Sequence, residues 1–243
     1  MNENGSRPAA EPRGHDVEVK QMKGHAIEMG QWALGMVHDG WLAFERGDLP
    51  LAQSVIDRDA RLDRFDQDVE REAVAFLVKA QPMGPDLRET TAVLKVITYL
   101  DRIGRYGFDI AWLTSPEGAY DKDELRELLR SMDGLAEGMV AKALDAMAND
   151  RGDLARSIFE LDDQVDEMNR SVYRIVIQEL RTDPSVTQRI ANELLVARHF
   201  ERIADHACKI AEKTIYAVTG QRRGEYLPKR APPSVGSDSG EAP

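Results

Sequence analysis

Carboxylates spaced four residues apart recur along this sequence and are its clearest candidates for chemistry. The acids are Asp59/Asp63, Asp162/Asp166 and Glu201/Asp205, with Asp101 placed 100 positions before Glu201. On a helix, residues at i and i+4 lie on one face. Carboxylates that converge from neighbouring helices supply the hard oxygen ligands that Mg, Ca, Mn and iron accept. The pattern therefore indicates one or two carboxylate metal sites.

A second interpretation of the same residues needs no metal. Arg102 and Arg202 directly follow Asp101 and Glu201, and acids beside arginines form i,i+4 ion pairs on a solvated helix face. A single acidic pair is more often such a face than a set of ligands. Because the acids recur at corresponding places in both halves of the chain, both interpretations stay open from the residues alone.

Other reactive side chains lie in the same region. His199 and His206 are seven residues apart and share a face roughly opposite Glu201 and Asp205, so we expect them at the surface or in the packing. Cys208 lies close to the acidic stripe, but a lone cysteine on a helix is more often a small buried apolar residue. No phosphate-binding loop, nucleophile elbow or zinc-protease motif occurs, and we expect no catalytic residue.

These side chains lie in segments whose apolar residues repeat with helical periodicity. Apolar residues recur three and four apart in six segments that Gly- and Pro-containing breaks separate, and no run alternates as a strand would. The second segment is predicted to be one helix from Leu51 to Lys79. The sequence Arg46-Gly47-Asp48-Leu49 returns as Arg151-Gly152-Asp153-Leu154. We therefore predict an all-α fold made by internal duplication: two tandem antiparallel three-helix bundles, residues 17–116 and 121–220, related by a pseudo-twofold.

Both ends of the chain are expected to be disordered tails, residues 1–16 and 221–243, because Pro, Gly, Ser and charged residues dominate them. In the second tail, Gln221 to Arg230 holds four basic residues against Glu225 alone. This local reversal of charge could touch anionic lipid or an acidic partner, although a solubilising tail is the simpler interpretation.

The composition limits the classes of partner. A net charge of −11 argues against nucleic acid, which attracts a basic surface. The single cysteine excludes an internal disulfide and suits a reducing compartment. The first 13 residues lack an apolar signal-type segment, and the longest apolar run, residues 73–78, is far shorter than the ~20 residues that span a bilayer. We expect a cytoplasmic protein that meets the membrane only through partners.

With these residues in view, the sequence resembles the PhoU family over about residues 17–220. The family signature, an acid followed by Asp four residues later, is matched closely by Glu201-Arg202-Ile203-Ala204-Asp205 and in degraded form by Asp101-Arg102-Ile103-Gly104-Arg105. By resemblance, Glu201 and Asp205 correspond to metal-ligand positions, with Asp162 and Asp166 as companion acids on the preceding helix. Asp59, Asp63 and Asp101 correspond in the first half, where Arg105 replaces an acid; Lys209 stands where an Asn is common.

The resemblance implies a fold of two three-helix bundles related by a pseudo-twofold, a cytoplasmic homodimer, and bound metal ions, iron above all, with Mg, Mn or Ca as alternatives. It also implies regulation of phosphate uptake and phosphate-starvation signalling through contact with the ATPase subunit of a phosphate ABC transporter, a sensor kinase, or both. Because Arg105 can neutralise the first site internally, we expect metal chiefly in the second half.

Other classes of helical protein fit less of the sequence. A di-iron oxidase needs Glu-x-x-His on two helices, and none of the five histidines has a Glu three residues before it. A sensor-kinase dimerisation module would use His38 or His199 as phosphate acceptor, but neither lies in a recognisable acceptor motif. A metal-free helical scaffold or interaction protein remains open.

Overall fold

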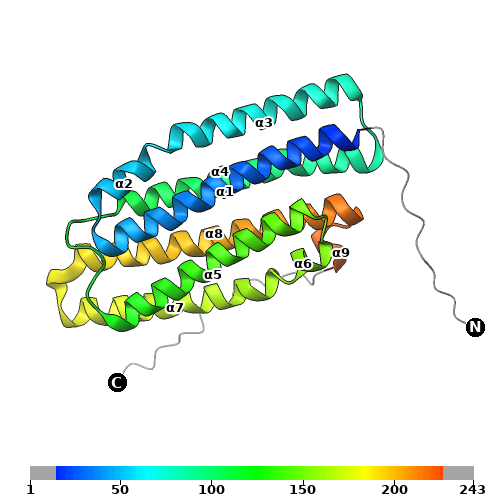
Figure 1. Cartoon of the computed structure of the whole chain (residues 1–243). Helices are drawn as coiled ribbons and strands as arrows, with labels where there is room; N and C mark the ends of the chain where they lie inside the picture. Colours follow the sequence, from blue (N-terminus) through cyan, green and yellow to red (C-terminus); the bar gives the residue numbers. More distant parts are fainter. Residues whose placement is uncertain (1–14, 227–243) are drawn as a thin grey trace, which may run out of the picture.

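The computed structural model describes residues 15–226, and its long elements are helices that run back and forth along one axis (Figure 1). They are α1 (Asp16–Arg46), α2 (Leu49–Ile56), α3 (Asp59–Ala80), α4 (Gly84–Trp112), α5 (Asp123–Ala148), α6 (Gly152–Arg156), α7 (Phe159–Thr182), a 3₁₀ turn η1 (Pro184–Val186), α8 (Thr187–Thr219) and α9 (Arg223–Tyr226). No strand occurs in residues 15–226, which confirms the predicted all-α class. Residues 1–14 and 227–243 of the predicted tails lie outside the described residues.

Four helices form the centre and two flank it. α1 packs on α4, α4 on α8, and α8 on α5, while α3 lies against α1 and α4, and α7 against α5 and α8 (Figure 1). The order long, short, long, long is the same in α1–α4 as in α5–α8. The outer helices, α3 and α7, are those that carry the acidic pairs of each half.

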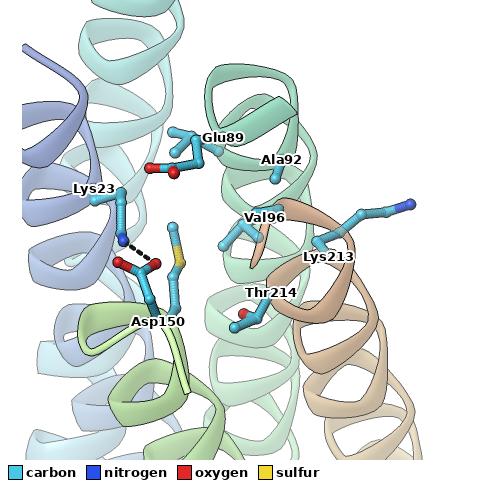
Figure 2. A pocket seen from close by; sticks show the side chains of 10 residues that line it. Lys23, Glu89, Ala92, Val96, Asp150, Lys213 and Thr214 are labelled. Carbon is cyan, nitrogen blue, oxygen red and sulfur yellow. Dashed lines mark hydrogen bonds and ion pairs between the residues drawn. The ribbon is translucent and has the colours of Figure 1, made fainter. Parts of the chain in front are cut away.

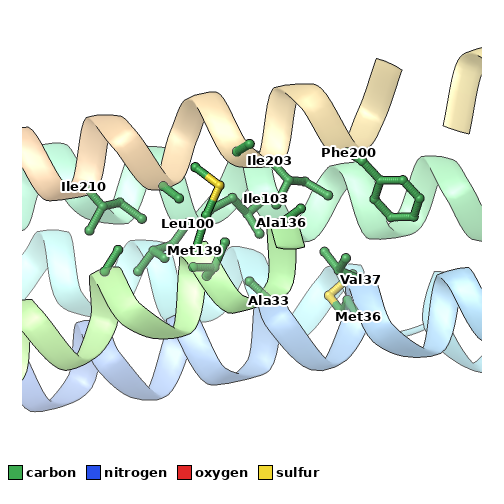
Figure 3. Packing of buried hydrophobic residues seen from close by; sticks show 14 of the residues in the cluster. Ala33, Met36, Val37, Leu100, Ile103, Ala136, Met139, Phe200, Ile203 and Ile210 are labelled. Atoms are coloured by element: carbon green, nitrogen blue, oxygen red, sulfur yellow. The ribbon is translucent and has the colours of Figure 1, made fainter. Parts of the chain in front are cut away.

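The centre of the molecule is one hydrophobic core that both halves share. Ala33 and Met36 of α1, Leu100 of α4, Met139 of α5 and Ile203 of α8 meet there (Figure 3), and all five side chains are fully buried. The three- and four-residue spacing of apolar residues on these helices places one stripe of each toward the shared core. Because the apolar faces of the central helices pack against one another, their polar sides face outward and toward α3 and α7.

The sequence predicted the second segment as one helix from Leu51 to Lys79, and this prediction was wrong. The structure divides it into α2 and α3 at Asp57 and Arg58. The Arg58 guanidinium pairs with Asp39 of α1 at 2.6 Å, and the Arg58 N–H donates to the carbonyl of Val55, three residues back, at 3.0 Å. Bonds of this i→i+3 type tighten the backbone and bend a helix, and the pair with Asp39 fixes the bend toward α1.

The fifth segment bends in the same way between α6 and α7. Here the N–H of Ile158 donates to the carbonyl of Ala155 at 3.3 Å, and both side chains are fully buried. Val55, whose carbonyl accepts the corresponding bond in the first half, is also fully buried. A continuous amphipathic helix would bury apolar residues at the same places, so periodicity alone missed both bends.

The start of the predicted C-terminal tail also needs correction, because residues 221–226 are placed and end in α9. The Tyr226 ring lies 4.7 Å from the Arg156 guanidinium and 6.3 Å from the Phe159 ring. A single aromatic residue in a polar segment is enough to dock it onto the bundle. As a further observation on the described residues, none of their helices combines the length and apolarity that a bilayer span requires.

The backbones of α1 and α4 approach each other closely, and glycines allow it. A Cβ built on Gly107 would lie 2.6 Å from the Met36 carbonyl carbon, and one on Gly40 would lie 2.5 Å from the Gly107 carbonyl oxygen. These are backbone atoms, which cannot move aside as a flexible side chain would. By contrast, a Cβ at Gly24 of α1 would meet nothing within 4 Å.

We therefore predict opposite effects for two glycine-to-alanine substitutions. Gly107→Ala should lower the free energy of unfolding by at least about 2 kcal/mol, because overpacking must push α1 from α4. Gly24→Ala should leave it unchanged or raise it by up to about 1 kcal/mol, because alanine favours a helix. Urea unfolding followed by circular dichroism measures both, and equal stabilities of the two variants would contradict the close approach.

Candidate metal site

The predicted first-half acids do come together, but around a guanidinium group. Asp59 and Asp63 on α3 face Asp101 and Arg105 on α4. Arg105 Nη2 lies 2.6 Å from Asp63, Nη1 lies 3.3 Å from Asp59, and Nε donates to both oxygens of Asp101 at 3.1 and 3.2 Å. One cation therefore bridges three carboxylates on two helices, and the space between them is filled by the arginine itself.

The electrostatics of this cluster agree with its geometry. The pKa of Arg105 is raised, first by the hydrogen bond to Asp101 and then by the neighbouring negative charges. Burial raises the pKa of Asp59, Arg105 opposes that shift, and the charges of Asp63 and Asp101 add to it. As placed, the first-half residues do not fit a metal ion, because a second cation would lie beside the guanidinium that already compensates them.

The second-half acids lie on α7 and α8, which pack together, and Asp205 stands where the first half has Arg105. Glu201 pairs with Arg198 at 2.7 Å through one oxygen, while its other oxygen is buried, has no hydrogen-bond partner and lies 3.8 Å from Arg202. Asp205 lies 3.6 Å from Arg202. An unsatisfied buried carboxylate oxygen is costly, so this half retains an incompletely compensated acid.

Neighbouring charges show that the four acids share one region. Burial raises the pKa of Glu201, Arg198 opposes that shift, and the charges of Asp205 and Asp166 raise it further. Asp162 is buried, and its charge, with that of Asp205, adds to the burial that raises the pKa of the Cys208 thiol. Cys208 is itself buried, as expected of a small apolar residue. The chemistry of these oxygen donors suits a hard cation.

The second-half carboxylates are near one another without converging. Within residues 15–226, no group of three or more His, Cys, Asp or Glu side chains is arranged to hold a metal ion. A cation would therefore have to draw the carboxylates of α7 and α8 together by side-chain rotation. The buried, unpartnered oxygen of Glu201 is the structural observation that fits such an ion, and the metal site itself stays a prediction.

The two histidines near this region belong to the packing between α4 and α8. His206 lies 5.9 Å from the Tyr99 ring and 5.6 Å from the Tyr106 ring, which also contacts His199 at 5.6 Å. The Nδ1–H of His206 donates to the carbonyl of Arg202 at 2.7 Å. Burial lowers the pKa of both histidines. They face the other half of the molecule and not the acids of α7.

Two buried acids with strongly raised pKa values escaped the sequence analysis. Asp133 of α5 is 9% exposed, and burial, reinforced by Glu137, raises its pKa to about 8. Glu193 of α8 is 1% exposed with a pKa raised by burial to about 7, and it accepts the N–H of Tyr120 in the loop that joins the halves. An acid within an apolar stripe, such as Asp133 between Leu129 and Ala136, is the signal that could have found them. Neither belongs to the acidic pairs of α3 and α7.

Comparison with known proteins identifies the two halves of the chain separately. A sequence profile of the PhoU domain matches residues 26–114 and again residues 129–214. A phosphate-specific transport system accessory protein PhoU homolog of Rhizobium meliloti is 33% identical over 86% of this chain and 90% of its own length. The homolog of the same description from Caulobacter vibrioides is 31% identical over 89% of this chain and 95% of its own length.

Solved structures have the same fold. The crystal structure of PhoU from Pseudomonas aeruginosa superimposes with a TM-score of 0.80 at 30% identity, covering 85% of this chain and 100% of that one. The phosphate transport system regulatory protein PhoU from Streptococcus pneumoniae gives a TM-score of 0.77 at 24% identity, covering 85% of this chain and 98% of that one. The second likeness bears on the fold alone.

The buried Asp133 generates a prediction about pH. Its folded-state pKa of about 8 lies above its ordinary value, so the folded protein keeps a proton that the unfolded chain releases. The stability that this proton contributes is fully present below about pH 4 and is lost as pH rises to about 8. Asp133→Asn cannot titrate, so stability should fall less between pH 5 and pH 8 in the variant, by at least about 1.4 kcal/mol, the equivalent of one pKa unit.

Urea unfolding at the two pH values measures the difference. The matched control is Glu127→Gln, which neutralises an exposed carboxylate of the same helix and should leave the pH dependence of wild type unchanged. Other titrating groups are common to all three proteins and cancel. An Asp133→Asn profile parallel to wild type would show that Asp133 is charged in the folded state.

Proposed function

The chain belongs to the PhoU family, and we propose that it is a regulatory accessory protein of phosphate transport and not an enzyme. The observation that carries this proposal is the match of the PhoU domain to both halves of the chain, residues 26–114 and 129–214. Relatives that share most of its length are described as accessory proteins of a phosphate-specific transport system. In the first half, Arg105 pairs with three of the acids, and a compensated cluster of this kind suits a structural or binding role better than catalysis.

The partners follow from the same family relation. We propose that the protein acts in the cytoplasm, as a homodimer, by contacting the ATPase subunit of a phosphate ABC transporter, a sensor kinase of phosphate starvation, or both. Such contacts would bring it to the membrane through its partners. They would also couple phosphate uptake to phosphate-responsive expression.

We further propose that a metal ion binds in the second half. Glu201 and Asp205 of α8 and Asp162 and Asp166 of α7 would hold it; iron is favoured by family resemblance, and Mg, Mn or Ca also suit oxygen ligands. The ion would supply positive charge to clustered carboxylates that repel one another, and it would tie α7 to α8. A metal-free scaffold is the second candidate, and the absence of a converging ligand group in residues 15–226 favours it.

The regulatory proposal is tested by deleting the gene. The deletion strain should show altered phosphate uptake or altered expression from a phosphate-responsive promoter, in at least one of high and low phosphate. Labelled-phosphate uptake and a promoter reporter measure these, and the wild-type gene supplied in trans should restore both. Unchanged uptake and expression at every phosphate level would overturn the pathway assignment.

The asymmetry between the halves is tested by metal content. Glu201→Ala or Asp205→Ala should remove most bound metal from protein purified without chelator, and should lower its melting temperature relative to the metal-loaded parent, since a ligand of the folded form stabilises it. Asp101→Ala is the matched control in the first half and should change metal content by less than about a fifth, because Arg105 already compensates that cluster.

Elemental analysis by mass spectrometry distinguishes the outcomes. Equal loss of metal from the Asp101 and Glu201 variants would contradict the asymmetry. A parent protein without metal would leave the scaffold as the better description of the bundle, while the regulatory proposal would still stand on the deletion experiment.

A further inference from the structure

A basic pocket lies on this acidic protein, where α4, the end of α8 and residues 221–226 meet. Its volume is about 330 Å³. Lys95 of α4, Lys213 of α8, Arg222 and Arg223 line it, and Glu212 is the only acid among its lining residues. The pocket therefore carries a local charge of +3 on a chain of net charge −11. A reversal of this size on one concave surface needs a physical explanation.

Only part of this positive charge is compensated within the protein. Glu212 pairs with Arg223, whereas the side chains of Lys95, Lys213 and Arg222 have no ion-pair partner among the residues that the structure describes. Three cations without an ion-pair partner therefore line the same pocket and repel one another. An anion that binds there would relieve this repulsion.

The neighbouring cavity shows that Lys213 is not used elsewhere. There Lys23 pairs with Asp150 at 2.5 Å, while the Lys213 ammonium extends away from that pair (Figure 2). That cavity offers about 10 Å³, room for no more than one water molecule. The larger basic pocket shares Ala92 and Lys213 with this cavity, and it is the one with space for a ligand.

The wall that carries the arginines is held in a defined position. The N–H of Arg222 donates to the Glu225 carboxylate at 2.6 Å, and Tyr226 packs against Arg156 and Phe159 of the bundle. On the facing helix, the Nε of Arg88 is buried without a hydrogen-bond partner. A Cβ built on Gly220, two residues before Arg222, would lie 3.7 Å from this nitrogen.

We propose that this pocket binds the diphosphate or triphosphate group of a small molecule. Arginine and lysine form charge-assisted hydrogen bonds with phosphate oxygens, and three uncompensated cations match a group of about three negative charges. A single phosphate carries at most about two charges at neutral pH and leaves a cation unmatched. The volume falls within the ~300–1,000 Å³ of small-molecule sites, and the Tyr216 ring in the lining offers a surface for a nucleobase. This inference does not depend on the proposed regulatory function.

The test uses the full-length protein, freed of metal on a chelating resin, with pyrophosphate and ATP as separate probes in calorimetry. Both probes should bind saturably at one site per chain. Lys213→Glu and Arg222→Glu should each weaken binding at least about tenfold, the loss of about 1.4 kcal/mol. Lys79→Glu makes the same change of charge at the end of α3, beside a different pocket, and should weaken binding by less than about twofold. Circular dichroism confirms that each variant is folded.

The two probes separate the sources of the phosphate group. Tighter binding of ATP, reduced to the level of pyrophosphate by Tyr216→Ala, identifies a nucleotide; equal binding identifies an inorganic polyphosphate as sufficient. Either result supports the site. It is overturned by the absence of saturable binding of both probes, or by equal weakening in Lys79→Glu. It is also overturned if the protein binds phosphatidylglycerol vesicles and pyrophosphate does not compete, because the basic face would then be a lipid surface.

Discussion

Packing places like charges close together in this protein, and the need to compensate them shapes much of the rest of the structure. α4 and α8 use their apolar faces on each other and on α1 and α5. Their polar sides therefore lie toward α3 and α7, which carry acids of their own. Carboxylates a few ångströms apart raise one another's pKa unless a cation lies between them. The contacts of α3 with α4 and of α7 with α8 are therefore two acidic seams. Each seam needs a source of positive charge, or must take up protons, for the bundle to form.

The two halves meet this requirement in different ways. The first half uses Arg105, which reaches Asp59, Asp63 and Asp101 at once. The second half has Asp205 at the corresponding place, 100 residues later. Arg198 lies 2.7 Å from one oxygen of Glu201, and Arg202 lies only within 3.8 Å of the other. One oxygen of Glu201 is left without a hydrogen bond. One exchange of residue type, Arg105 against Asp205, thus removes from the second half the cation that bridges the first.

Much of this arrangement could be predicted from the sequence. The periodic apolar residues and the repeated Arg-Gly-Asp-Leu motif were enough for an all-helical chain with acids on corresponding helices, and Arg105 could be recognised as out of pattern. Its three partners could not be known, because the reach of a guanidinium depends on the distance between α3 and α4. That distance is set partly by Gly104 of α4, where a Cβ would lie 2.4 Å from the Leu62 side chain of α3. The bends at Arg58 and Ile158 are likewise tertiary, since one depends on Asp39 and the other on burial.

Glu212 shows where the acidic seam of α8 ends. It lies four residues after Cys208 and seven after Asp205, so its position continues the acidic stripe along the helix. In the fold its carboxylate pairs with Arg223, in a segment that Tyr226 anchors. A carboxylate held by a guanidinium is a poor ligand for a second cation. Glu212 therefore belongs with the basic pocket and not with the acids of α7 and α8. α8 therefore changes its electrostatic character within about two turns, from Glu201 and Asp205 facing α7 to Lys213 facing α4. This change follows from the neighbouring helices, because one face of α8 meets α7 and another meets α4.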